Sequence, residues 1–257
     1  LGAAKTGVCG AHGATRTGVD KGVLMVFRRM VQAGAIAALG AGSALTGVVA
    51  PTASAQPCPD VEVVFARGTS EAPGVGGVGQ AFVDAVRAQA APRTVGVYAV
   101  NYPAGSNFEQ REVFAGTVID GVRDASDHVR AMAANCPNTK LVLSGFSQGA
   151  VVSGFATSDV VPPSVPAAVA PAPLPPEVAD NVAAVVLFGA PSGAFLSKYG
   201  APAINIGPLY RDKTLELCNP GDGICSGAPD GGPGIAHALY PVNGSVNEGA
   251  AYAVGRL

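Results

Sequence analysis

The sequence predicts an α/β protein of three layers, with helices on both faces of a central, mainly parallel sheet of five strands. Short apolar runs rich in β-branched residues alternate with segments of helical spacing, an alternation typical of parallel sheets. The runs are apolar at consecutive positions, as expected of strands buried on both faces. A length of 257 residues, 48% of them hydrophobic, suits one domain with a complete core.

The first part of the chain is expected to lie outside this domain. Residues Met25 to Arg29 form a short positive segment, residues 31–49 are uncharged and almost wholly apolar or small, and Ala53 to Ala55 match the pattern that a signal peptidase cuts. We predict an upstream segment and signal peptide over residues 1–55, with the signal at about 25–55. A single membrane anchor is the alternative. The mature domain would span 56–257 and be secreted or associated with the cell envelope.

The elements are predicted in chain order from their periodicity. Helical spacing is seen from Gly79 to Ala90 and from Phe108 to Ala134. The last strand is either Ala203 to Ile206 or a stretch near Thr214 to Leu217. The other predicted strands are Val61 to Ala66, Thr94 to Val100, Leu141 to Leu143 and Ala183 to Phe188.

The segment from Val160 to Glu177, here called the Pro-rich segment, interrupts this alternation. It holds seven prolines, so it cannot be a helix interior or a central strand. We interpret it as a surface loop inserted between a helix and the next strand. A lid or rim over an active site is one possible role, but we favour a tolerated insertion without such a role.

Charge and cysteine content exclude several classes of function. From Gln56 onward acidic residues outnumber basic ones and no Lys/Arg-rich stretch occurs, so nucleic acid is not expected as a partner. Cys58, Cys136, Cys218 and Cys225 predict two disulfides in an exported chain, with three pairings open. This part has no Cys-x-x-Cys pair and only two histidines, which argues against a metal site.

Gly145-Phe146-Ser147-Gln148-Gly149 follows the third predicted strand and precedes an Ala- and Val-rich segment, Ala150 to Ala156. In a chain this rich in glycine the string alone is weak evidence, and an ordinary turn is the alternative. Its position between a strand and a helix is what a nucleophile requires. There a serine takes strained dihedrals that expose its Oγ above the sheet, while flanking glycines avoid collisions. The context predicts Ser147 as a nucleophile in a fold of the α/β-hydrolase type.

A nucleophilic serine needs a base and a carboxylate that orients this base, and in this fold type the chain order is serine, acid, histidine. His237 is the only histidine after Ser147 and is the predicted base. We interpret His128 as a solvated helix residue.

Asp222 is the favoured acid because it lies between Cys218 and Cys225, where a disulfide closing a small loop would hold the carboxylate in place. A preference of aspartate for turns next to Pro and Gly is the alternative explanation. By chain order alone six other carboxylates remain candidates: Asp159, Glu177, Asp180, Asp212, Glu216 and Asp230.

With these motifs in order, the chain from Cys58 onward resembles the cutinase family of serine esterases, and its actinobacterial cutinase-like branch in particular. The resemblance rests on Phe65-Ala66-Arg67-Gly68-Thr69-Ser70-Glu71, on the sequence around Ser147, and on Cys218-Asn219-Pro220-Gly221-Asp222-Gly223-Ile224-Cys225 followed by His237. Four motifs in the correct order are far more specific than the Gly-x-Ser-x-Gly string alone.

The resemblance implies a triad of Ser147, Asp222 and His237. It also implies an oxyanion hole formed by the main-chain N–H of Gln148 and by Thr69, which donates its N–H and its Oγ–H. Such donors stabilise the tetrahedral oxyanion. Thr69 replaces the serine of the best-known fungal members, which also lack the Pro-rich segment; both departures bear on substrate preference rather than on chemistry.

The resemblance further implies disulfides Cys58–Cys136 and Cys218–Cys225. It suggests ester or lipid-like substrates bound in an open, shallow cleft. From their proximity to His237 in the sequence, Ile235 and Leu239 are candidate lining residues, and we expect a monomer. The reaction would proceed through an acyl-enzyme and require no metal or cofactor.

The sequence therefore predicts a secreted carboxylic ester hydrolase. A phospholipase, thioesterase or peptidase with the same triad is one alternative. A non-catalytic secreted surface protein is an alternative from another class.

Overall fold

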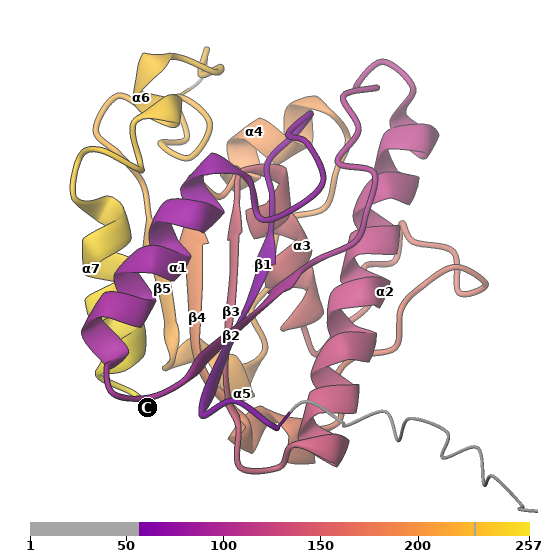
Figure 1. Cartoon of the computed structure of the whole chain (residues 1–257). Helices are drawn as coiled ribbons and strands as arrows, with labels where there is room; N and C mark the ends of the chain where they lie inside the picture. Colours follow the sequence, from indigo (N-terminus) through magenta and orange to yellow (C-terminus); the bar gives the residue numbers. More distant parts are fainter. Residues whose placement is uncertain (1–56, 229) are drawn as a thin grey trace, which may run out of the picture. The chain divides into compact units, whose positions relative to one another are not determined.

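The computed structural model describes residues 57–228 and 230–257; the predicted signal peptide lies outside them. At the centre is a five-stranded sheet of order β2-β1-β3-β4-β5, in which every neighbouring pair is parallel (Figure 1). This confirms the predicted fold class. The strands are β1 (Val61–Ala66), β2 (Val95–Ala99), β3 (Lys140–Phe146), β4 (Val182–Phe188) and β5 (Thr214–Leu217).

Four longer helices cover the two faces of the sheet. Helices α1 (Gly76–Ala90) and α7 (Ser245–Val254) lie on one face, and α2 (Arg111–Asn135) and α3 (Gln148–Ala156) lie on the other (Figure 1). The shorter elements are the 3₁₀ helix η1 (Pro176–Asp180) and the helices α4 (Gly193–Lys198), α5 (Pro208–Arg211) and α6 (Ile235–Ala238).

Continuous apolar strands produce a core on each side of the sheet. In β1 every residue is buried, and successive side chains point to opposite faces. Val64 packs in the cluster with α2 and α3, whereas Val63 packs with Phe82 of α1 in the other cluster. Strand β3, which leads directly to Ser147, lies between β1 and β4, so neighbouring strands fix it on both sides.

The fifth strand is Thr214–Leu217, and the alternative at Ala203 to Ile206 is wrong. That run is irregular chain, and Ile204 and Ile206 pack against the core on the α2 and α3 side. An apolar run signals burial, which irregular chain satisfies as well as a strand does. Among the described residues, no helix combines the length and apolar character needed to cross a bilayer.

The interpretation of His128 as a solvated residue is also wrong. Its Nε2 lies 2.7 Å from Oε2 of Glu62, which is buried on β1. Its ring stacks on Tyr98 of β2, with 3.5 Å between the centroids. His128 therefore joins α2 to the sheet and has a structural role.

Candidate active site

Ser147 occupies a strained turn between β3 and α3. Its backbone has φ 55° and ψ −116°, a left-handed φ that is costly for a residue with a Cβ. The Ser147 N–H donates to the carbonyl of Phe188 at 2.9 Å, which ties the turn to the end of β4. The neighbouring strand thus stabilises a conformation that an isolated serine would avoid.

The two glycines that flank Ser147 are required by space. A Cβ on Gly145 would collide with the carbonyl oxygen of Gly149, and a Cβ on Gly149 would collide with the carbonyl oxygen of Ala66. The Gly-x-Ser-x-Gly pattern therefore lets β3, α3 and the end of β1 approach closely enough to form this turn.

His237 and Asp222 form a hydrogen-bonded pair. His237 lies on α6, and its Nδ1 is 2.8 Å from Oδ2 of Asp222. The Asp222 side chain is fully buried, while that of His237 is 13% exposed. A buried carboxylate on one ring nitrogen favours the proton on Nδ1 and leaves Nε2 free to accept one.

The sequence did not indicate two other residues that hold this carboxylate. Tyr240 donates its hydroxyl to Asp222 Oδ2 at 2.7 Å, and Oδ1 accepts the N–H of Ile224 at 2.9 Å. The same tyrosine hydroxyl accepts the N–H of Asn219 at 3.0 Å. Burial, together with the bond to Asp222, raises the pKa of Tyr240 above its ordinary value, so this hydroxyl remains a donor.

The loop after β5 is fixed at several points. The disulfide Cys218–Cys225 closes the stretch that contains Asp222. A second disulfide, Cys58–Cys136, lies outside this loop and joins the chain before β1 to the end of α2. These are the pairs that the resemblance implied. Asn219 donates its side-chain N–H to the carbonyl of Ala236 at 2.9 Å, which links the Asp222 loop to the His237 helix.

Ser147 and His237 line the same cavity, with Thr69 and Gln148. Asp222 reaches this cavity through His237. The hydrogen bonds found among residues 57–228 and 230–257 do not include one between the Ser147 hydroxyl and the His237 ring. Catalytic contacts of this kind are often long in a free enzyme and shorten when substrate binds.

Thr69 lies in a turn that is held by two charged neighbours. Buried Arg67 donates to the carbonyls of Glu71 at 2.8 Å and Tyr102 at 2.6 Å. The Glu71 carboxylate accepts the N–H groups of Gly68 at 2.6 Å and Gly77 at 2.8 Å. These bonds fix the backbone on both sides of Thr69. The sequence carried Arg67 and Glu71 only as part of a family motif.

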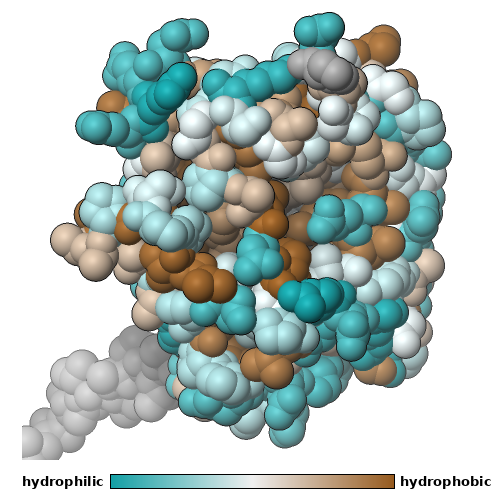
Figure 2. Space-filling model, turned by 180° about the vertical axis from the view of Figure 1, so that it is seen from behind, coloured by the Kyte–Doolittle hydropathy of each residue, from teal (hydrophilic) through white to brown (hydrophobic). Residues whose placement is uncertain are grey.

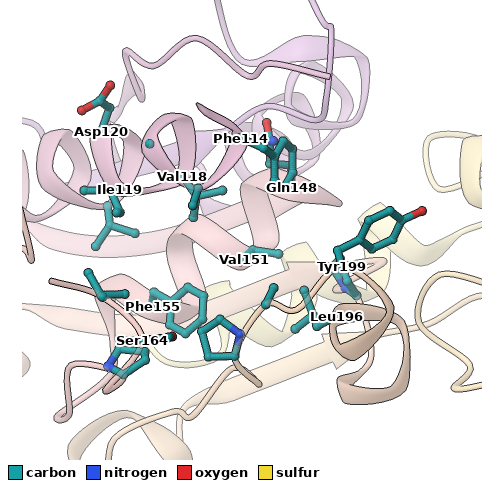
Figure 3. Close-up of a pocket in the computed structure, with 18 of the residues that line it drawn as sticks. Phe114, Val118, Ile119, Asp120, Gln148, Val151, Phe155, Ser164, Leu196 and Tyr199 are labelled. Carbon is teal, nitrogen blue, oxygen red and sulfur yellow. The ribbon is translucent and has the colours of Figure 1, made fainter. Parts of the chain in front are cut away.

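The cavity beside Ser147 has a volume of about 1180 Å³. On the face seen in Figure 2, apolar side chains surround a hollow. Figure 3 shows Val118 and Ile119 of α2 facing Val151 and Phe155 of α3 across the cavity. The cavity is partly open to solvent, but its volume is larger than the shallow cleft that the resemblance implied.

Two predictions about the cavity walls are wrong. Ile235 and Leu239 do not line the cavity; Ile235 is 80% exposed and points to solvent. The Pro-rich segment is not a plain insertion, because its residues from Val160 to Pro173 supply part of the wall. Composition indicated a loop, but it carried no information on what the loop would contact.

The described residues contain no cluster of three His, Cys, Asp or Glu side chains that could hold a metal ion. The groups near Ser147 are instead a hydroxyl, an imidazole, a carboxylate behind it, and backbone N–H groups. This is the set of groups that nucleophilic acyl transfer uses.

Comparisons with known proteins agree with this geometry. Residues 57–257 match the family model Cutinase. The chain is 56% identical over 169 residues to "Probable carboxylesterase Culp7" of Mycobacterium tuberculosis, covering 66% of this chain and 88% of that protein. It is 44% identical over 230 residues to "Phospholipase Culp4" of the same organism, covering 90% and 92%.

Among solved structures, "Trichoderma reesei cutinase in complex with a C11Y4 phosphonate inhibitor" superposes with a TM-score of 0.58. It has 32% sequence identity and covers 77% of each chain. The resemblance seen in the sequence is therefore confirmed. The chain belongs to the cutinase family of serine ester hydrolases.

Proposed function

We propose that the protein hydrolyses carboxylic esters with a triad of Ser147, His237 and Asp222, through an acyl-enzyme intermediate. The observation that carries this proposal is the 2.8 Å bond between His237 Nδ1 and Asp222 Oδ2 in the wall of the cavity that Ser147 also lines. This pair leaves the second ring nitrogen to act on the serine hydroxyl.

In the first half of the reaction, Ser147 Oγ attacks the ester carbonyl and its proton passes to His237 Nε2. The Asp222 carboxylate stabilises the imidazolium that forms. The main-chain N–H of Gln148 and the Thr69 turn donate to the developing oxyanion, a contribution worth about 10²–10³ in rate for each donor. His237 then gives its proton to the leaving alcohol.

In the second half, water replaces the alcohol. His237 takes a proton from the water, the hydroxide attacks the acyl-enzyme carbonyl, and Ser147 leaves with the proton. The carboxylic acid is released and the free enzyme is restored. Every proton in this cycle therefore passes through one imidazole, that of His237.

The names of the relatives support ester or lipid substrates. Since one relative of high coverage is named a phospholipase, the ester bonds of phospholipids fall within the proposal. Two disulfides among the described residues support the proposal that the protein is exported, because disulfides persist in oxidising compartments.

The test is hydrolysis of p-nitrophenyl butyrate by the wild type and by Ser147→Ala. We expect the variant to lose several orders of magnitude in kcat, on the order of 10⁴ or more, and to keep its unfolding midpoint. Ser226→Ala, at an exposed serine, is the matched control and should be fully active. Equal turnover by wild type and Ser147→Ala would exclude the proposed nucleophile.

A fluorophosphonate label gives a second reading. It should attach to Ser147 in folded wild-type protein and not in His237→Ala, because the hydroxyl needs its base to react. Labelling that does not depend on His237 would contradict the assigned base.

A further inference from the structure

The cavity beside Ser147 extends much further than an ester bond requires. At α2, residues that line it run from Arg111 to Ser126, a distance of about 22 Å along the helix axis. Its volume of about 1180 Å³ exceeds the upper end of ordinary small-molecule pockets, about 1,000 Å³. A bilayer leaflet, and so one lipid acyl chain, measures about 15 Å.

The interior of this extension is apolar. Val118 and Ile119 of α2 face Val151 and Phe155 of α3 (Figure 3). Apart from His237, the charged residues of the lining lie at exposed positions of α2. In Figure 3 the carboxylate of one of them, Asp120, turns away from the apolar side chains. An apolar occupant would therefore meet no buried, unpaired charge.

The Pro-rich segment lines one side of the extension and is held in place. Arg123 of α2 donates to the carbonyl of Val169 at 2.9 Å, and Arg130 donates to the carbonyl of Ala172 at 2.7 Å. Beyond these bonds, Leu174 is buried in the core on the α2 and α3 side. The segment therefore forms a fixed wall opposite the two helices.

We propose that this extension is the binding site for one long, unbranched acyl chain of the substrate, enclosed between α2, α3 and the Pro-rich segment. The inference rests on the proposed function, since Ser147 defines where the ester carbonyl lies. It makes the Pro-rich segment the element that determines acyl-chain selectivity.

The geometry also distinguishes the acyl side of the ester from the alcohol side. His237 must reach the oxygen of the leaving alcohol in order to protonate it. His237 comes from α6, whereas the extension runs from Ser147 along α2. The alcohol thus lies on the His237 side and the acyl chain points into the extension.

The first measurement is kcat/KM for monomeric p-nitrophenyl butyrate and decanoate, each below its critical micelle concentration. Each buried methylene contributes up to about fourfold in binding, so we expect the decanoate value to be at least about tenfold higher. Ethyl decanoate should likewise be hydrolysed faster than decyl acetate. Equal kcat/KM values for p-nitrophenyl butyrate and decanoate, or faster hydrolysis of decyl acetate than of ethyl decanoate, would overturn the proposal.

Gly116→Trp tests the location. Gly116 lines the cavity, and a Cβ at this position meets no atom within 4 Å. Removing a glycine from a helix interior also favours folding. We expect an indole there to reduce decanoate hydrolysis at least about tenfold more than butyrate hydrolysis. Val118→Trp, at a residue that faces α3 across the extension (Figure 3), is a second blocking variant with the same expected profile.

Val113→Trp is the matched control, because Val113 is an exposed residue of the same helix and does not line the cavity. It should retain the wild-type preference. The proposed acyl site would be overturned if the blocking variants lowered the hydrolysis of decanoate and of butyrate equally, or lowered neither. Failure of the proposed function is distinguishable, since it would appear as butyrate hydrolysis that does not depend on Ser147.

Discussion

Tyr240→Phe removes one oxygen atom from the centre of the candidate site. The hydroxyl donates to Asp222 at 2.7 Å and accepts from Asn219 N–H at 3.0 Å. The ring would be retained, with its centroid contacts to Phe146 at 5.7 Å and Phe188 at 6.1 Å. The substitution therefore isolates two hydrogen bonds from the packing.

The cost follows from these two bonds. A hydrogen bond to a charged group contributes about 1.5–3 kcal/mol, and a buried N–H left without an acceptor costs about 1–3 kcal/mol. Tyr240 is fully buried, so water has no direct route to replace its hydroxyl. We expect the free energy of unfolding, as measured by urea denaturation, to fall by about 2.5–6 kcal/mol, the sum of these two ranges.

Activity provides an independent reading. Asp222 keeps its bond from Ile224 N–H, but with one donor fewer its carboxylate is held less firmly against His237 Nδ1. We expect kcat to fall several-fold with little change in KM, because the carboxylate orients the base. Tyr252→Phe is the control, because this tyrosine lies on α7, away from Asp222. An unchanged unfolding free energy together with an unchanged kcat would refute the reasoning.

Two further predictions follow from buried polar groups. Arg67→Lys should lower kcat about 10–100-fold with little change in KM, because lysine cannot make the forked bonds that hold the Thr69 turn. When Arg67→Lys is combined with Thr69→Val, the two losses of kcat should be less than additive in free energy. Full additivity would show that Arg67 acts elsewhere. Burial raises the pKa of Tyr98 and of Tyr210 from 10.0 to about 12. Above about pH 10 the unfolded state therefore loses protons that the folded state keeps. Because of this difference, the free energy of unfolding should fall as the pH rises from about 10 to about 12. Urea midpoints at pH 9 and pH 11 check this, and equal midpoints would contradict it.

Much of the fold was predictable because the strands are buried on both faces. Continuous β-branched runs such as Val61 to Ala66 have few alternative explanations in a chain of this length. The fifth strand was ambiguous because Ile204 and Ile206, which lie in irregular chain, pack partly buried against the core and give the same signal. For His128, the decisive partner was Glu62, which lies on another element and cannot be inferred from helical spacing.

The candidate site was predictable where chain order restricts the choice. One histidine follows Ser147, so elimination leaves His237 as the single candidate for the base, whereas seven carboxylates satisfy the order and only coordinates place Asp222 beside the imidazole. Tyr240, Asn219 and the walls of the cavity depend on contacts between distant segments. No local pattern encodes such contacts.

The Pro-rich segment has a consequence for how this architecture can diverge. In parallel α/β sheets, loops at the carboxyl ends of the strands usually carry both the chemistry and the choice of ligand. Here the segment connects α3 to the start of β4, at the opposite end of the strands, and yet supplies a wall of the cavity that Ser147 also lines. Insertions or deletions in this connection can reshape the neighbouring space while the turn, the imidazole and the carboxylate keep their positions.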